Sequence, residues 1–280
     1  MKRKTMVILF ALGLILNLSF AISLNNAPDS GTFNWTSYND SLHLDGSLPG
    51  GVDITGLAGL WHMDSDWNDS SGNGNDLTGY NGILFTAGKV GSHSASFDGA
   101  NDYLHNSLFD MGLATYSWGA WVKFDNTYRM PIITAGESVD GYDMHLTKNS
   151  YRQILCDARM DRNNYIQSNT GLVPFNGLWY HIFCIYDGDS LRSYVNGVNI
   201  ANVTVQVGSF TPLGTDAIKI GMTTNWYNYG ARYFDGSIDE VSVWSRVLST
   251  AEVSQIYHAQ KDIYPSSGDF ISDVLDAGSR

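Results

Sequence analysis

The chain has 280 residues, 43% of them apolar and 16% charged, with a formal net charge of −12. That length supports one large domain with a buried core. An acidic surface repels phosphate backbones, so we expect no nucleic-acid partner. Aromatic residues make up 13% of the chain, and Glu137, Glu240 and Glu252 are the only glutamates. Aromatic residues favour strands and aspartates favour turns, so this composition indicates a β protein with acidic loops.

The N-terminus has the pattern of an export signal. Three positive residues (2–4) precede an apolar run (6–16), which predicts a signal peptide over 1–21. The alternative is an uncleaved membrane anchor, but Asn17 interrupts the run before the ~20 residues that a spanning helix needs. We expect a secreted or cell-surface protein whose mature domain does not insert into the membrane.

The next segment, 22–56, is polar and rich in Gly, Asn and Pro, with a short strand expected at 32–38. At the other end of the chain, 261–280 contains a strand-like stretch, 270–275. We interpret 22–56 as a linker and 261–280 as a linker or the start of a further module of a larger protein.

Between these ends, short aromatic and β-branched segments alternate with turns rich in Gly, Asn and Asp. Residues 116–124 place every second side chain on one face, and 179–186 are apolar nearly throughout. Asn196-Gly197 predicts a type I′ hairpin, because that turn needs positive φ at both central residues. The spacing of the segments predicts an antiparallel sandwich or barrel.

One short helix is expected near the C-terminal end, over about 250–260. The sequence Ser249-Thr250-Ala251-Glu252 is a capping box, in which the first and last residues satisfy each other's backbone N–H groups. Leu248 and Val253 stand where a hydrophobic staple would form.

The two cysteines, Cys156 and Cys184, both lie in strand-like runs. A cross-strand disulfide and two buried thiols both remain open, because the sequence does not give the Cα separation. Neither cysteine belongs to a CxxC pair, which argues against zinc.

Residues 234–249 (FDGSIDEVSVWSRVLS), followed by Glu252 and Tyr257, resemble the closing signature of laminin-G-like jellyroll domains of the concanavalin A-like lectin/glucanase superfamily. Three further stretches resemble that family in the expected order: 59–75, 96–104 and 179–197. The resemblance spans 57–260. It implies an all-β fold, a two-sheet antiparallel jellyroll sandwich.

We expect no catalysis, although the superfamily contains glycanases. Glycoside hydrolysis needs a pair of carboxyl groups at a set separation, which these enzymes commonly place at alternate positions of one strand. Asp239 and Glu240 are adjacent, so on a regular strand they point to opposite faces. Glu252 is assigned to the helix cap. A polysaccharide hydrolase with an atypical Asp pair is the minor alternative.

Calcium is a candidate cofactor, because hard cations prefer clustered carboxylate and carbonyl oxygens in loops. The resemblance implies a rim site for which Asp157 is the closest counterpart by position. Asp69, Asp98 and Asp239 are further candidates, each with a competing structural role. For Asp239 that role is anchoring of neighbouring turns or pairing with Arg246.

Recognition is expected on loops that carry aromatic and amide side chains, because such side chains stack on sugar rings and bond hydroxyls. The candidate ligand-binding residues are Asn225, Trp226, Tyr227, Tyr229 and Arg232, with Tyr128 and Arg129 as a smaller set. We therefore expect a secreted, non-catalytic module that binds glycan. A structural or adhesion module that binds protein partners is the first alternative.

Overall fold

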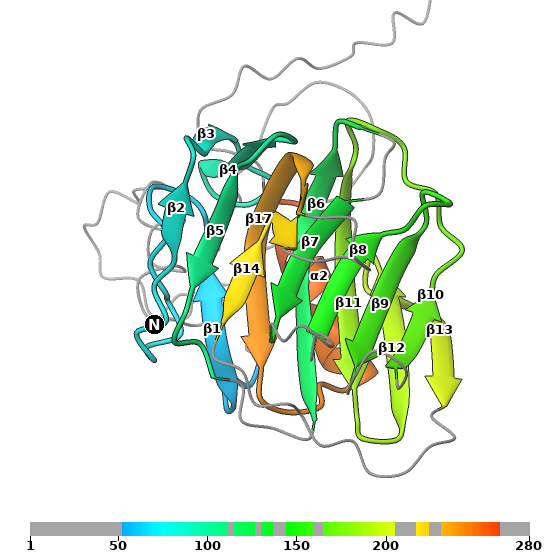
Figure 1. The fold of residues 1–280 in the computed structure, drawn as a ribbon. Coiled ribbons are helices and arrows are strands. Elements are labelled where there is room, and N and C mark those ends of the chain that lie inside the picture. Colours follow the sequence, from blue (N-terminus) through cyan, green and yellow to red (C-terminus); the bar gives the residue numbers. More distant parts are fainter. Residues whose placement is uncertain are drawn as a thin grey trace, which may run out of the picture. The chain divides into compact units, whose positions relative to one another are not determined.

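Two antiparallel sheets stack face to face in the computed structural model of the protein (Figure 1). The structure describes residues 52–110, 115–126, 130–136, 144–159, 165–204, 217–223 and 231–263. The predicted signal peptide, almost all of 22–56 and nearly all of 261–280 lie outside these ranges. None of the described helical segments is long and apolar enough to cross a bilayer.

The first sheet has eight strands. Their order is β13 (Val198–Thr204), β12 (Ser190–Val195), β11 (Trp179–Tyr186), β6 (Tyr116–Phe124), β17 (Asp235–Trp244), β4 (His93–Asp98) and β3 (Leu84–Ala87), with β1 (Leu57–Trp61) also pairing with β17.

The second sheet has seven strands. Their order is β10 (Tyr165–Asn169), β9 (Ile154–Arg159), β8 (Met144–Lys148), β7 (Met130–Ala135), β14 (Ile218–Ile220), β5 (Tyr103–Asn106) and β2 (Thr78–Tyr80). A separate hairpin joins β15 (Met222–Thr223) to β16 (Arg232–Tyr233). With the helix α2 (Thr250–Gln260), these elements confirm the predicted jellyroll sandwich.

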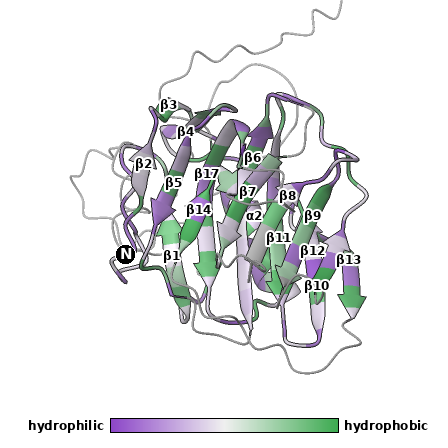
Figure 2. Cartoon of the chain, viewed as in Figure 1, coloured by the Kyte–Doolittle hydropathy of each residue, from purple (hydrophilic) through white to green (hydrophobic). Residues whose placement is uncertain are grey.

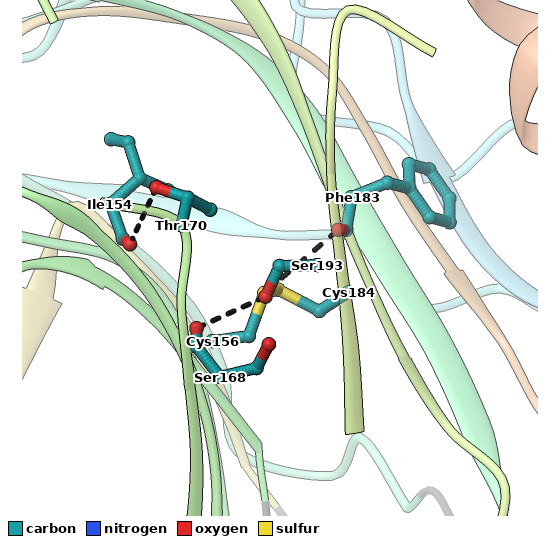
Figure 3. The surroundings of a disulfide bond; sticks show 7 residues. All are labelled: Ile154, Cys156, Ser168, Thr170, Phe183, Cys184 and Ser193. Atoms are coloured by element: carbon teal, nitrogen blue, oxygen red, sulfur yellow. Dashed lines mark hydrogen bonds between the residues drawn. A yellow bond between two sulfur atoms is a disulfide. The ribbon is translucent and has the colours of Figure 1, made fainter. Parts of the chain in front are cut away.

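A disulfide between Cys156 and Cys184 joins the two layers through the core (Figure 3). Cys156 lies on β9 of the seven-stranded sheet and Cys184 on β11 of the eight-stranded sheet, with 5.8 Å between their Cα atoms. Beside it, the Ser193 hydroxyl of β12 donates to the Ser168 carbonyl of β10 at 3.0 Å. Of the two states left open by the sequence, the structure contains the bridged one.

The local signals of the sequence appear as predicted in the hairpin and the helix. Asn196 and Gly197 have φ of 51° and 76°, as a type I′ turn requires. The Ser249 hydroxyl accepts from the N–H of Glu252, whose carboxylate accepts from the N–H of Ser249. The predicted capping box therefore starts α2 at Thr250.

The helix covers the outer face of the eight-stranded sheet, and Figure 1 shows it behind both sheets. Val253 and Ile256 of α2 pack with Phe183 and Trp244, which belong to β11 and β17. The central strands of this sheet are thus buried on both sides. The aromatic and apolar content of its central strands follows from that double burial.

A β-bulge in β17 brings Asp239 and Glu240 into one buried hydrogen-bonded cluster. The ladder to β6 shifts register between Asp239 and Ser242, and Glu240 has a φ of 50°. The expected alternation of the two carboxylates is therefore interrupted here. Asp239 accepts from the backbone N–H groups of Lys89 and Val90 at 2.7 and 3.0 Å.

Glu240 connects the end of α2 to the sheet. One carboxylate oxygen lies 2.8 Å from Nδ1 of His62, and the other accepts from the Gln260 amide at 2.9 Å. The Gln260 side chain in turn accepts from the indole N–H of Trp121. Asp239 thus anchors the neighbouring turn as expected, but its alternative pairing with Arg246 is wrong. Arg246 binds Glu252 of the helix cap instead, at 2.6 Å.

Removal of the disulfide should destabilise the fold. The bridge joins residues 28 positions apart, so in the chain-entropy account the double variant Cys156→Ala/Cys184→Ala loses about 3 kcal/mol of unfolding free energy. Urea unfolding followed by tryptophan fluorescence measures this loss. The parent protein under a reducing agent serves as the control and should match the variant. A loss within error of zero in both would contradict the structural role of the bridge.

The His62–Glu240 pair should make stability depend on pH. Burial lowers the pKa of His62, but the Glu240 carboxylate outweighs burial and raises that pKa from 6.5 to about 9. A raised folded-state pKa stabilises the fold fully below pH 6.5, and the effect disappears as pH rises through about 9. The loss amounts to about 3 kcal/mol at most. Unfolding free energies between pH 6 and 10 measure it.

The matched variant is His62→Gln, which keeps an amide donor to Glu240 and does not titrate. Burial lowers the pKa values of Lys148 and Lys219 to about 8, so both lysines titrate with the opposite sign in parent and variant alike. The difference between the two pH profiles therefore isolates His62. Parallel profiles would show that the ion pair contributes no pH dependence.

Candidate ligand-binding face

One row of polar residues crosses the outer face of the seven-stranded sheet. Residues of this sheet that alternate with the row, such as Leu104, Ile133 and Cys156, belong to the core between the sheets. Cross-strand partners share a face, so the register defines a row from β2 to β10. Its members are Thr78, His105, Lys219, Thr134, the register position of His145, Asp157 and Gln167. We call this set the polar row.

Period-two alternation produces the polar row. In β14 the sequence Ile218-Lys219-Ile220 buries both isoleucines in the core and turns the lysine outward. Figure 2 shows the same change from hydrophobic to hydrophilic along β14. Each strand contributes one polar residue at the matching register position, so residues far apart in the sequence become neighbours across the sheet.

The centre of the polar row is buried. Thr134 is only 3% exposed, and its hydroxyl has no hydrogen-bond partner among the described residues. Asp157 is also buried and accepts from the Gln167 amide at 3.0 Å. A buried hydroxyl without a partner is costly, and Thr134 Oγ1 is one of ten such buried side-chain atoms among the described residues. It marks a position where water or a ligand hydroxyl could supply the missing bond.

Burial also sets the charge of the row. It lowers the pKa of Lys219 to about 8, because the ammonium ion is largely removed from water. The pKa of His105 is lowered first by burial and then by the nearby charge of Lys219. Both shifts run toward the neutral forms, but with a pKa of about 8 Lys219 is still mainly an ammonium ion at pH 7, and it can donate to a hydroxyl group in that form.

An aromatic pair continues this face at its β2 end. The rings of Tyr80 and Tyr103 stack at 4.6 Å with an interplanar angle of 2°. The two tyrosines are cross-strand partners. Tyr103 lies two residues from His105 on the same face of β5, and Tyr80 is 38% exposed. Burial, then Tyr80 and Tyr233, raise the pKa of Tyr103. The pair is a flat, partly accessible apolar surface beside the polar row.

The predicted recognition loop connects, in sequence, β15 to β16 of the separate hairpin, and this hairpin follows β14 of the seven-stranded sheet. Thr223 of β15 pairs with Arg232 of β16, and Gly221, with a φ of 82°, directs the chain from β14 into β15. Arg232 is half-buried, and its Nε has no hydrogen-bond partner within the described ranges. Because β14 and β7 are antiparallel, the chain leaves β15 at the same end of the sheet where it enters β7. The other predicted ligand residues lie outside the described residues: Asn225, Trp226, Tyr227, Tyr229, Tyr128 and Arg129.

The four candidate calcium ligands, Asp69, Asp98, Asp157 and Asp239, have different structural roles. The carboxylate of Asp69 accepts from the backbone N–H groups of Leu60, Ser71 and Asn75. Asp98 accepts from the N–H of Ala100 in its own turn.

Asp157 belongs to the polar row and Asp239 to the bulge cluster. Burial, and then Glu240, raise the pKa of Asp239 well above its usual range. Within the described ranges, no three His, Cys, Asp or Glu side chains are grouped so that they could hold a metal ion. These surroundings do not fit a carboxylate-rich calcium site.

Sequence reasoning missed the polar row, although each member carried part of the signal. Lys219 lies between two isoleucines, and Thr134 follows an apolar run in β7. A polar residue inside a short apolar strand marks an outward-facing position. The register that joins such positions across strands comes only from the folded structure.

The solved structures similar to this chain include a domain of an arabinanase and binding domains of botulinum neurotoxins. Domain 4 of AbnA, a GH43 extracellular arabinanase from Geobacillus stearothermophilus, in complex with arabinotriose, is 19% identical, with a TM-score of 0.59, covering 72% of this chain and 98% of that one. The receptor binding domain of botulinum neurotoxin C/D mosaic serotype is 12% identical, with a TM-score of 0.59, covering 74% and 52%. The binding domain of botulinum neurotoxin DC in complex with rat synaptotagmin II is 11% identical, with a TM-score of 0.59, covering 74% and 52%.

At these identities the likenesses show the fold, and the chain spans about half of each toxin structure. Comparison with curated proteins gives no match. The sequence profile of one family matches residues 97–254, which is more than half of the chain. The family's jellyroll fold is the one described above. The chain therefore belongs to the concanavalin A-like lectin/glucanases superfamily.

Proposed function

We propose that the protein is an exported, non-catalytic module that binds glycan on the outer face of its seven-stranded sheet. The observation that carries this proposal is the polar row, with the buried unpartnered hydroxyl of Thr134 at its centre. The helix α2 covers the central strands of the eight-stranded sheet, whereas no described helix lies over the outer face of the seven-stranded sheet. The arabinotriose complex of the similar arabinanase domain supports sugar as the ligand class.

The chemistry of this face suits a sugar. The stacked Tyr80–Tyr103 pair offers a flat apolar surface to the C–H face of a pyranose or furanose ring. Thr134 and Gln167 then provide hydroxyl and amide groups that bond sugar hydroxyls. We propose Asn225, Trp226, Tyr227, Tyr229 and Arg232, together with Tyr128 and Arg129, as further ligand contacts. Of these, Arg232 is within the described residues.

Protein partners are the second candidate function. The observation in favour is the similarity to a neurotoxin binding domain solved with rat synaptotagmin II. Tyrosine and arginine side chains such as Tyr80 and Arg232 are also common in protein interfaces. In either case we propose that the module acts outside the cell, exported by the signal peptide at 1–21 and joined to further modules.

Calcium enters the proposal only as an organiser of loops near Asp157, Asp69, Asp98 or Asp239. The described surroundings of these residues give it little support. A chelator arm in each binding experiment measures its contribution directly.

Binding should depend on the centre of the polar row. Thr134→Val removes the unpartnered hydroxyl and keeps the shape of the side chain. We expect glycan affinity to fall about tenfold, the effect of one lost hydrogen bond of about 1.4 kcal/mol, while stability stays level or rises. The matched control Thr86→Val lies on β3 of the other sheet and should bind normally. A glycan array followed by calorimetry with arabino-oligosaccharides, with and without chelator, measures both variants.

The aromatic surface gives a second pair of variants in the same experiment. Tyr80→Ala should weaken binding, and Tyr151→Ala, an equally large change at an exposed loop, should not. The double variant Trp226→Ala/Tyr229→Ala measures how much the recognition loop contributes to the glycan affinity. Normal glycan binding by Thr134→Val and Tyr80→Ala together would exclude the proposed face, and no glycan binding by the parent would favour protein partners.

The proposal predicts no glycan hydrolysis. On the polar row Asp157 is the one acidic side chain in the described part of the chain, whereas hydrolysis needs two carboxyl groups. Asp239 and Glu240 are both engaged in the buried cluster. Prolonged incubation with soluble polysaccharides, assayed for new reducing ends, should match a heat-denatured control. Reducing ends that form with the parent and disappear with Asp157→Asn would make the protein a hydrolase.

A further inference from the structure

The strand β13 is an edge without the usual protection. Within the described residues it pairs only with β12, at the end of the eight-stranded sheet. Val198, Ile200 and Val203 are all exposed, and the sequence VNIANVT contains no charge and no proline. Natural edge strands normally carry lysine, proline or a cover against pairing with another chain. An uncharged edge in a chain of net charge −12 indicates a surface that meets a partner.

The sequence of this edge is complementary to itself. If two copies of β13 run antiparallel about a twofold axis at Ala201, with Ile200 outside the ladder as the bulged residue, Val198 lies opposite Val203 and Asn199 opposite Asn202. Valine then meets valine and asparagine meets asparagine. Such matched cross-strand pairs stabilise antiparallel ladders.

The register of β13 on β12 places these pairs on matching faces. Val198 and Val203 pair with Val195 and Leu191, which belong to the core between the sheets. Asn199 pairs with Tyr194, which packs under α2 on the other face. Both valines therefore lie on one face of the strand, and Asn199 lies on the opposite one, as a continuous sheet across two copies requires.

A β-bulge at the centre of β13 changes which residues share a face. The β12–β13 register shifts between Ser193 and Tyr194, so Ile200 is the additional residue of β13. The small Ala201 then faces Ala201 of the second copy at the axis, and Ile200 stands next to it outside the ladder. Without this extra residue, Val198 and Val203 would point to opposite faces of the strand.

We propose that the protein forms a twofold dimer in which β13 pairs antiparallel with β13 of a second copy. The two eight-stranded sheets then become one continuous sheet. The axis passes through this sheet, so both seven-stranded sheets lie on the same side of the dimer. In terms of the proposed function, two ligand-binding faces then point in one direction, which favours avidity on a repeating polymer or a surface.

Sedimentation velocity of the full chain over a wide concentration range tests the dimer. The parent should show a concentration-dependent dimer. Ile200→Lys places two positive charges beside the axis and should sediment as a monomer. Val173→Lys is the matched control, because Val173 is 48% exposed and Ile200 47%, and it should remain dimeric. A monomeric parent at every concentration, or a dimeric Ile200→Lys, would overturn the proposal.

A second set of variants tests the register and uses only exposed side chains. Asn199→Lys/Asn202→Lys sets like charges opposite each other and should be monomeric. Asn199→Asp/Asn202→Lys sets opposite charges together and should dimerise at least as well as the parent. Equal behaviour of these two variants would reject the pairing. Their affinity for a single soluble sugar should equal that of the parent, so a failure here is distinct from a failure of the proposed glycan site.

Discussion

The buried cluster at the bulge of β17 decides which face of the sandwich remains for a ligand. Glu240 holds both His62 and the last residue of α2, so the helix is fixed on the outer face of the eight-stranded sheet. Asp239 fixes the adjacent turn through Lys89 and Val90. With the central strands of one sheet covered on both sides, the outward-facing polar residues of the seven-stranded sheet are a set that the described core does not use. The buried cluster thus fixes the position of α2, and the position of α2 is one reason to place the proposed ligand site on the other sheet.

In this arrangement the acidic residues have a structural role. In a fold with glucanase relatives, a catalytic role would have been the first expectation for them. Carboxylates that accept backbone N–H groups stabilise turns. Asp69, Asp98 and the buried Asp239 all do this in the described structure. The many aspartates of the chain are consistent with a scaffold of loops held by side chains. Recognition is then left to hydroxyl, amide and aromatic groups.

Features encoded within a few residues could be predicted from the sequence. The capping box at Ser249 and the turn at Asn196-Gly197 both formed, since each depends only on neighbouring residues. The jellyroll followed from the order of several motifs. The pairing of Cys156 with Cys184 stayed open, because it depends on the approach of two strands from different sheets. The polar row and the bulge at Glu240 depend on register and on one local φ, and neither leaves a pattern along the chain.

A crystal structure of the protein with a bound oligosaccharide is the most direct test of sugar binding on the outer face of the seven-stranded sheet. We expect a sugar hydroxyl within hydrogen-bonding distance of Thr134 Oγ1 and a ring seated against the Tyr80–Tyr103 pair. A sugar bound instead over α2, or held only in the turns around Asp69 and Asp98, would contradict this expectation.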